Sequence, residues 1–227
     1  MTMTSEARSR LRGLYAVTPE TPDTARLVAR VEECIAGGAA LVQYRAKLAA
    51  PVLALEQARR LAFACRAGGA LLIVNDSVDL AAAVNADGVH LGRDDIDLVG
   101  ARAALPGKII GMSCYDDPER ARAAAAAGAD YVAIGSVFAS RSKPDAVRAP
   151  LETLARARAA SGLPVAAIGG ITAGNARLAL AAGADMLAVI SALFDDADVR
   201  GAAAAFTCLF DSLATPNSHV RAQQRTV

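Results

Sequence analysis

Three polar side chains occupy alternating positions at the end of one short apolar run: Gln43, Arg45 and Lys47. In an extended chain, alternate side chains point to the same side, so we expect the amide and the two cations to converge. Two converging cations suit a phosphate or a diphosphate, because an Arg side chain can donate to two oxygens at once. The alternative is a solvated strand end with unrelated charges, and this phrase alone leaves both interpretations open.

Carboxylates follow the next two apolar runs. Asn75 and Asp76 come after one run, and Asp95 comes shortly after the other. Mg²⁺ typically binds one or two carboxylates together with phosphate oxygens, so Asp76 and Asp95 are candidate ligands, with Asn75 helping to hold the phosphates. The alternative is that each aspartate caps the helix that follows it. A metal site and a cationic site on adjacent strands favour the first interpretation.

A second group of anion-binding residues comes later in the chain. It combines hydroxyls, cations and glycines, whose backbone N–H groups can approach an anion closely. Its members are Ser140, Arg141, Ser142, Lys143, Gly169, Gly170 and Ser191, and Ser113 ends a further apolar run. Phosphate bound by the loops after the last two strands is a recurrent feature of parallel barrels. Two separate anion sites imply two phosphorylated ligands or one long one.

The elements that would position these residues are short apolar runs that alternate with alanine-rich segments of helical period. Such continuous runs are typical of strands buried on both faces of a parallel sheet. The eight runs are Leu14–Val17, Leu41–Tyr44, Leu71–Val74, Val89–Leu91, Ile109–Met112, Tyr131–Ile134, Val165–Ile168 and Leu187–Ile190. The helical segments include Thr24–Ala36, Pro51–Ala67, Val78–Val84, Pro118–Ala127, Leu151–Ala160 and Asn175–Ala182.

Successive runs begin about 25 residues apart, which is compact but sufficient for one strand and one helix. Eight such units with no second core favour an α/β fold that is a single closed (β/α)₈ barrel, or TIM barrel, over an open doubly wound sheet. We expect one domain over residues 1–214 and a polar tail over residues 215–227. In a barrel, the active site lies where the strands end, so the polar residues above should share one rim.

Composition excludes several classes of protein. The formal net charge of the 227-residue chain is +1, too small for unspecific nucleic-acid binding. No apolar stretch approaches the length of a membrane span, and the first ten residues do not match a secretory signal. The four cysteines form no CxxC pair, which favours reduced thiols in a cytoplasmic protein. The anion-binding residues above favour small-molecule substrates. A homo-oligomer is compatible with these features.

Two residues near the expected site are given no catalytic role. His90 lies within an apolar run, so we expect a buried, hydrogen-bonded histidine rather than a general base. Cys114 follows Ser113, but the sequence places no histidine base beside it, so a nucleophilic role is not favoured.

Taken together in order and spacing, seven phrases resemble the thiamine-phosphate synthase family over residues 14–193. They are YAVT at 15–18, QYRAK at 43–47, NDSVDLA at 75–81, ADGVHLGRDD at 86–95, GADYVAIG at 128–135, IGGI at 168–171 and AVISA at 188–192. The resemblance implies a barrel transferase of thiamine biosynthesis. Such an enzyme joins hydroxymethylpyrimidine diphosphate to hydroxyethylthiazole phosphate, releases pyrophosphate and forms thiamine phosphate.

The resemblance also implies residue roles. The phrase at 43–47 with Asn75 and Lys143 would bind the diphosphate, Asp76 and Asp95 would bind Mg²⁺, and Ser113 would bind the pyrimidine. The diphosphate set therefore includes Gln43, Tyr44, Arg45, Ala46 and Lys47. The thiazole phosphate would be bound by Ser140, Arg141, Ser142, Gly170, Ile190 and Ser191. Arg45, Lys47, Lys143 and Ser113 would carry the catalysis.

The chain departs from the family pattern in two places. Serine stands at positions 140 and 142, where the family commonly has threonine, which keeps the hydroxyl and loses the stiffening methyl group. Pro19 ends the first run, where an acidic or amide residue is common. The alternatives are a thiazole tautomerase paralogue, which needs neither a diphosphate nor a metal, and a non-catalytic relative that binds thiamine phosphate.

Overall fold

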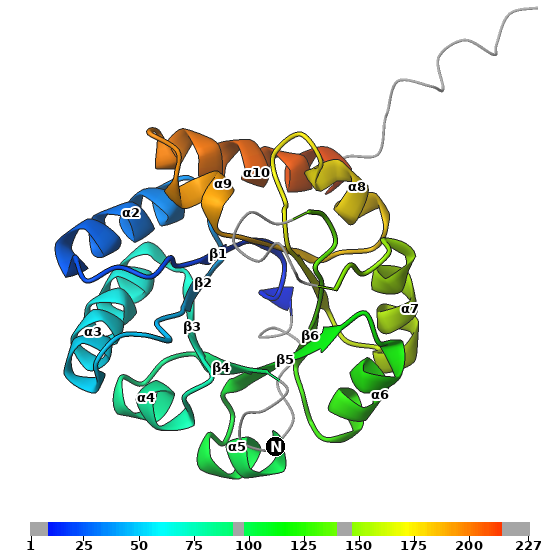
Figure 1. Cartoon of the computed structure of the whole chain (residues 1–227), viewed down its shortest axis with the longest axis horizontal. Helices are drawn as coiled ribbons and strands as arrows, with labels where there is room; N and C mark the ends of the chain where they lie inside the picture. Colours follow the sequence, from blue (N-terminus) through cyan, green and yellow to red (C-terminus); the bar gives the residue numbers. More distant parts are fainter. Residues whose placement is uncertain (1–8, 93–97, 140–146, 215–227) are drawn as a thin grey trace, which may run out of the picture.

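The computed structural model describes residues 9–92, 98–139 and 147–214. Eight parallel strands form a closed barrel in sequence order, with β1 pairing to both β2 and β8, and helices surround it (Figure 1). The predicted (β/α)₈ barrel is therefore confirmed. The strands are β1 (Gly13–Val17), β2 (Leu41–Tyr44), β3 (Leu71–Asn75), β4 (Gly88–Leu91), β5 (Ile109–Tyr115), β6 (Tyr131–Ile134), β7 (Val165–Ile168) and β8 (Met186–Val189).

Most of the helices each follow a strand and cover the outside of the barrel, as Figure 1 shows. They are α2 (Thr24–Ala36), α3 (Pro51–Gly68), α4 (Val78–Ala83), α5 (Leu98–Ala104), α6 (Pro118–Ala126), α7 (Glu152–Ser161), α8 (Ala176–Ala181), α9 (Ser191–Phe194) and α10 (Val199–Ala214). No helix in the described ranges is both long enough and apolar enough to cross a membrane.

Side chains alternate between two apolar layers, because successive residues of a strand point to opposite faces. Tyr15 and Val17 of β1 belong to a core inside the barrel, whereas Leu14 and Ala16 belong to the core between the sheet and the helices. Both layers are buried. This double burial explains why the strands are continuous apolar runs in the sequence.

Three aspartates bind backbone N–H groups at the amino-terminal ends of the strands. Asp87, Asp130 and Asp185 directly precede β4, β6 and β8. Each accepts a 2.8 Å hydrogen bond from a backbone N–H of a neighbouring strand. The repeated Gly-Ala-Asp phrase at 128 and 183 supplies two of them. Their position at the amino-terminal ends of the strands indicates a role in stability rather than catalysis.

Two strand boundaries near the site differ from those expected. The apolar run ends at Met112, but β5 continues to Tyr115, with an irregular register against β6 between Ser113 and Tyr115. Such irregularities redirect side chains near active sites. β8 ends at Val189, one residue before Ile190, which instead precedes the short helix α9.

Candidate active site

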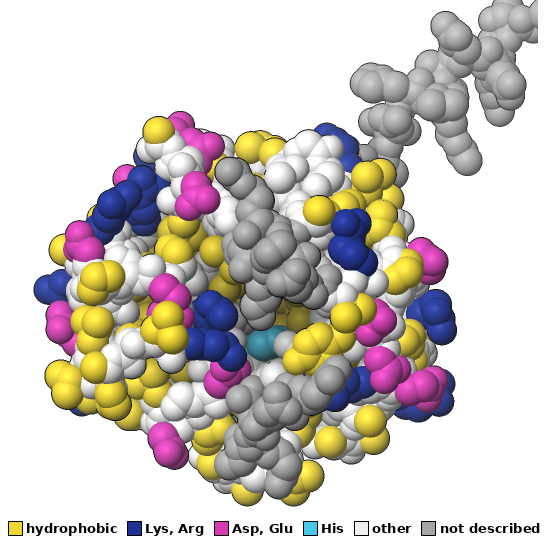
Figure 2. Space-filling model, in the orientation of Figure 1, with side chains coloured by type: hydrophobic (Ala, Val, Ile, Leu, Met, Phe, Trp, Pro, Cys, Tyr) yellow, Lys and Arg dark blue, Asp and Glu magenta, His cyan; other side chains and the backbone are white. Residues whose placement is uncertain are grey.

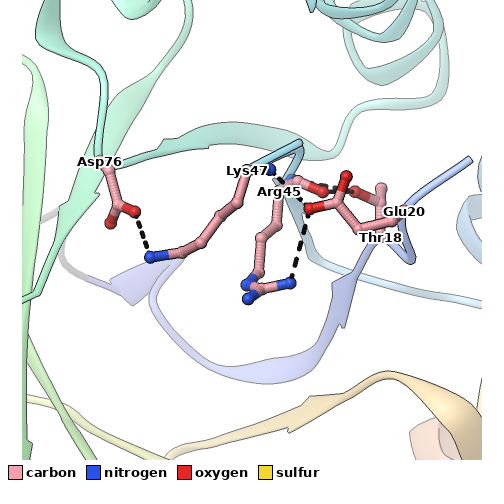
Figure 3. Close-up of polar contacts among 5 residues, drawn as sticks. All are labelled: Thr18, Glu20, Arg45, Lys47 and Asp76. Carbon is pink, nitrogen blue, oxygen red and sulfur yellow. Dashed lines mark hydrogen bonds and ion pairs between the residues drawn. The ribbon is translucent and has the colours of Figure 1, made fainter. Parts of the chain in front are cut away.

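The carboxyl ends of β2 and β3 bring cations and a carboxylate together at one rim of the barrel. Arg45 and Lys47 follow β2, and Asp76 follows β3. Figure 2, which looks onto one end of the barrel, shows basic side chains gathered beside a central hollow. Figure 3 shows the Lys47 side chain reaching Asp76, and the Arg45 side chain on the other side of Lys47, reaching Glu20. The expectation that strand ends would gather these residues is met for this part of the rim.

The end of β1 fixes the backbone that carries the two cations (Figure 3). Thr18 is fully buried, and its hydroxyl accepts a 2.9 Å hydrogen bond from the Arg45 N–H. Glu20 accepts a 2.5 Å hydrogen bond from the Lys47 N–H, and its carboxylate lies 3.9 Å from the Arg45 guanidinium. Both cations are thus presented by a loop anchored to the neighbouring strand rather than by a free strand end.

Thr18 and Glu20 were not among the residues expected in the site. The sequence did hold a signal for Glu20. Pro19 stands where the family commonly has an acidic or amide residue, and Glu20 is the next residue. The structure shows that Glu20 still reaches the loop after β2. Thr18 belongs to the phrase at 15–18, but its contact with Arg45 could not be predicted from that phrase, because the two residues are 27 positions apart in the chain.

Asp76 stands in an unusual backbone conformation for a residue with a side chain. Its φ is +62°, in the left-handed region, and its N–H donates to the His90 carbonyl at 2.8 Å. Such strain is commonly retained at functional sites, and Asp tolerates it better than most residues. The carboxylate pairs with Lys47 at 2.7 Å. The alternative that Asp76 caps α4 is wrong, because Ser77 caps that helix by accepting from the Leu80 N–H.

The donor chemistry of this rim fits Mg²⁺. Asp76 offers a partly exposed carboxylate of hard oxygens, and Mg²⁺ commonly takes only one or two protein carboxylates beside phosphate oxygens and water. The described residues contain no group of three or more metal-binding side chains. The second candidate ligand, Asp95, lies outside the described residues. Asp76 is therefore the one proposed ligand whose surroundings can be given.

Ser113 of β5 meets His90 of β4 inside the barrel. The serine hydroxyl lies 2.9 Å from His90 Nε2, and the Ser113 side chain is only partly buried. His90 is buried, as expected, and its Nδ1 lies 2.9 Å from the Tyr131 hydroxyl. Burial lowers the pKa of His90 to about 4, against the opposing effect of the Asp76 charge. The histidine is thus neutral and hydrogen-bonded at neutral pH, as the sequence led us to expect.

The phrase at 43–47 divides between three environments. Gln43 lies deeper in the barrel than Arg45 and donates a 2.9 Å hydrogen bond to the Tyr15 hydroxyl. Tyr44 points the other way and donates to Gln57 of α3 at 2.8 Å. Ala46 packs against the outer core. The alternation of side chains along β2 predicts that Tyr44 faces the helices, away from the barrel interior.

The loop after β7 touches the segment after β6. Phe138 N–H donates to the Gly169 carbonyl at 3.0 Å. Gly170 has φ +63°, and a Cβ there would lie 2.1 Å from the Ala139 carbonyl oxygen. Only glycine allows this approach. Residue 140, the first of the expected phosphate-binding segment, therefore follows directly on a residue in contact with Gly170.

The remaining expected residues lie at other points of the rim or outside the described ranges. Asn75 is the last residue of β3 and is partly buried. Ile190 packs against the core inside the barrel, and Ser191 begins α9. Ser140, Arg141, Ser142, Lys143 and Asp95 lie outside the described residues.

Cys114 has the surroundings of a structural thiol. The side chain is buried, and burial raises the pKa of its thiol to about 12. The reactive form of cysteine is the thiolate, so this residue stays protonated and unreactive at neutral pH. The expectation that Cys114 is not a nucleophile agrees with this environment.

The low pKa of His90 predicts a pH-dependent loss of stability. An unfolded histidine titrates near pH 6.5, so between about pH 6.5 and the folded pKa of about 4 the unfolded chain binds more protons. The free energy of unfolding should therefore fall by about 3 kcal/mol from this residue as the pH is lowered through that window. Urea unfolding of the native chain and of a His90→Asn variant, at about pH 7 and about pH 4.5, measures this contribution. Parallel pH dependence in the two proteins would contradict it.

Known proteins are similar to this chain over most of its length. A family model described as thiamine monophosphate synthase matches residues 14–193. The thiamine-phosphate synthase of Aromatoleum aromaticum is 56% identical over 205 residues, which covers 90% of this chain and 99% of that relative. The thiamine-phosphate synthase of an Azoarcus species is 56% identical over 202 residues, covering 88% of this chain and 98% of the relative.

Solved structures give the same result. Thiamine phosphate pyrophosphorylase from Pyrococcus furiosus superimposes with a TM-score of 0.83 at 38% identity, covering 92% of this chain and 99% of that one. A geranylgeranylglyceryl phosphate synthase from Thermoplasma acidophilum superimposes with a TM-score of 0.68 over 93% of this chain and 99% of that one, but at 16% identity it shares the fold alone. Because the family model spans residues 14–193 and the relatives are alike over nearly their whole length, this chain belongs to the thiamine monophosphate synthase family.

Proposed function

We propose that this chain is a thiamine-phosphate synthase, a transferase that couples hydroxymethylpyrimidine diphosphate to hydroxyethylthiazole phosphate and releases pyrophosphate. The observation that carries the proposal is the meeting of Arg45, Lys47 and Asp76 at the carboxyl ends of β2 and β3. Two cations beside a carboxylate suit a metal-bound diphosphate. Relatives that are 56% identical over nearly their whole length carry the name of this activity.

The reaction breaks the bond between the pyrimidine methylene carbon and a diphosphate oxygen. The bonding electrons leave with the pyrophosphate, and the thiazole nitrogen supplies the pair that forms the new carbon–nitrogen bond. No proton transfer is obligatory, so the main requirement is to stabilise charge on the departing oxygens. Arg45 and Lys47 provide fixed positive charge for this purpose, on a loop anchored by Thr18 and Glu20.

Asp76 and Asp95 are the proposed ligands of Mg²⁺. When bound there, Mg²⁺ supplies further positive charge to the diphosphate oxygens. The Lys47 ammonium, which pairs with Asp76 at 2.7 Å, would then be free to bind the diphosphate. Asn75, Lys143 and Gln43 complete the proposed diphosphate site.

The second substrate would bind on the other side of the rim. The proposed thiazole phosphate site consists of Ser140, Arg141, Ser142, Gly170, Ile190 and Ser191. Support comes from the close approach of Gly170 to Ala139, which brings the loops after β6 and β7 together. Ser113 would bind the pyrimidine ring between the two phosphate sites. Holding two rings in contact lowers the entropic part of the barrier.

A tautomerase would not need this rim. That reaction involves no diphosphate and no metal, whereas this rim presents two cations, Arg45 paired with Glu20 and Lys47 paired with Asp76. A carrier that binds thiamine phosphate without turnover would keep the rim and release no pyrophosphate. The experiment below separates these possibilities.

Pyrophosphate release should require all three components of the coupling reaction. We expect stoichiometric pyrophosphate and thiamine phosphate when the pyrimidine diphosphate, the thiazole phosphate and Mg²⁺ are mixed with the full chain. Omission of any one should reduce release to background. Binding of both substrates without pyrophosphate release would contradict the proposal and indicate the carrier. Thiazole isomerisation without coupling would indicate the tautomerase.

A further inference from the structure

A continuous line of hydrogen bonds crosses the interior of the barrel from β2 to β5. Gln43 Nε2 donates to the Tyr15 hydroxyl at 2.9 Å, and the Tyr15 and Tyr131 hydroxyls lie 2.8 Å apart. The Tyr131 hydroxyl lies 2.9 Å from His90 Nδ1, and His90 Nε2 lies 2.9 Å from Ser113 Oγ. The line therefore connects β2, which is followed by the loop with Arg45 and Lys47, to Ser113, the residue proposed to bind the pyrimidine.

The protons along this line can be assigned from its first member. Each phenol has a single proton to donate. Because Gln43 donates to Tyr15, the Tyr15 proton goes to Tyr131, and the Tyr131 proton goes to His90 Nδ1. A neutral imidazole that accepts at Nδ1 carries its own proton on Nε2. His90 then donates that proton to the Ser113 hydroxyl oxygen.

The opposite direction would leave a buried proton unpaired. With the Gln43 amide presenting Nε2 to Tyr15, a proton on His90 Nδ1 would make Tyr131 donate to Tyr15, and the Tyr15 proton would then have no acceptor there. Only an amide turned to present Oε1 would supply one. An unsatisfied buried donor costs about 1–3 kcal/mol. Within the described ranges, every buried side-chain nitrogen and oxygen has a hydrogen-bond partner. The direction from Gln43 to Ser113 satisfies each proton.

The packing of the barrel fixes the rings in place. Tyr131 stacks on His90, with ring centres 5.5 Å apart, and meets Tyr15 edge to face at 6.0 Å. Gly111 of β5 makes room for Tyr131, because a Cβ there would lie 2.4 Å from the Tyr131 hydroxyl oxygen. Barrel interiors are usually filled with branched apolar side chains, so a polar line through this one calls for a role beyond filling space.

We infer that Tyr131 and His90 are positioning residues that hold Ser113 as a hydrogen-bond donor toward the pyrimidine. The Ser113 hydroxyl oxygen accepts from His90, and within the described part of the chain the hydroxyl has no other hydrogen-bond partner. Its own proton is therefore left for the bound ring. The site then offers a hydrogen-bond donor to an unprotonated acceptor nitrogen of the ring that faces Ser113. This inference rests on the proposed function, because it takes the pyrimidine as the ring bound at Ser113.

The tautomer of His90 tests the inference without any measurement of activity. The chain has two histidines, so in a His219→Gln variant His90 is the only one. Nitrogen-15 NMR of this variant, labelled at histidine, should show the proton on Nε2 and a bare Nδ1 at neutral pH. A proton on Nδ1 would overturn the inference, whatever the outcome of the pyrophosphate assay. Conversely, the expected tautomer in a protein without turnover would confirm the proton order along the line and refute the proposed function, and with it the pyrimidine as the ring at Ser113.

A double-mutant cycle tests whether Tyr131 acts through Ser113. Tyr131→Phe removes only the hydroxyl that fixes His90, and Ser113→Ala removes the donor itself. Each variant should raise the KM for the pyrimidine diphosphate by about tenfold, the effect of one lost hydrogen bond, and leave the KM for the thiazole phosphate unchanged. The double variant should be no worse than Ser113→Ala alone.

A purely structural role for Tyr131 would give a different pattern. The two effects on KM would then multiply, or the KM for both substrates would rise together, and either result would overturn the inference. Urea unfolding of each variant reports whether the barrel remains folded. If Tyr131→Phe fails to fold, the NMR measurement on the chain with native Tyr131 decides the question.

Discussion

Replacing Arg45 with alanine is expected to lower kcat for pyrophosphate release by about 10²–10³-fold, the usual effect of removing one preorganised group that stabilises transition-state charge. The Arg45 side chain is about three-quarters buried and lies 3.9 Å from Glu20. Its removal takes away a cation and leaves the Glu20 carboxylate beside the departing pyrophosphate. Both changes raise the energy of the transition state more than that of the bound substrate.

The measurement is steady-state pyrophosphate release at saturating Mg²⁺ and both substrates. Arg122→Ala provides a matched control, because Arg122 is an exposed arginine of α6 that pairs with Glu119. Arg45→Lys should show a smaller loss, since lysine keeps the charge but cannot donate to two oxygens at once. If Arg45→Ala and Arg122→Ala had equal kcat, Arg45 would have no part in the chemistry.

Asp76→Asn is expected to raise the Mg²⁺ concentration needed for half-maximal activity by at least about tenfold, in line with the effects of altering metal-site residues. Asparagine keeps the size of the side chain and an oxygen that can accept from Lys47, so the fold and the left-handed backbone at this position should persist. What is lost is the negative charge that a divalent cation requires.

A Mg²⁺ titration of pyrophosphate release separates this effect from a general loss of activity. Partial recovery at high Mg²⁺ would support a ligand role for Asp76. Asp79→Asn serves as the control, because Asp79 is an exposed aspartate in the first turn of α4. An unchanged Mg²⁺ requirement in Asp76→Asn would remove Asp76 from the metal site.

Glu20 has two roles in the loop after β2 that carries Arg45 and Lys47. Its carboxylate accepts from the Lys47 N–H and sits near the Arg45 guanidinium, so it both anchors the loop and offsets part of the positive charge. In the absence of substrate, each cation thus has a carboxylate nearby: Glu20 for Arg45 and Asp76 for Lys47. A diphosphate with Mg²⁺ would exchange these contacts for stronger ones.

The barrel itself could be predicted from the sequence because its signals are local. A strand buried on both faces must be a continuous apolar run, and eight such runs with helical segments between them leave few other folds. The same local logic predicted that Arg45, Lys47, Asp76 and Ser113 lie at or near the strand ends, since polar residues there face the rim. The sequence predicted the strand boundaries less accurately. In β5, for example, the strand continues past Met112, where the apolar run ends.

What lay beyond the sequence were contacts between distant segments. Tyr15 and Tyr131 are 116 residues apart and meet only because the barrel closes and sets the stagger of its strands. The contacts of Thr18 and Glu20 with the loop after β2 also depend on that stagger. The chain by itself determined the fold and the chemistry at the strand ends, because those follow from burial and alternation within each strand. Only the tertiary structure decided which hydroxyl faces which nitrogen, because hydrogen bonds depend on distances of a few tenths of an ångström that no local pattern encodes.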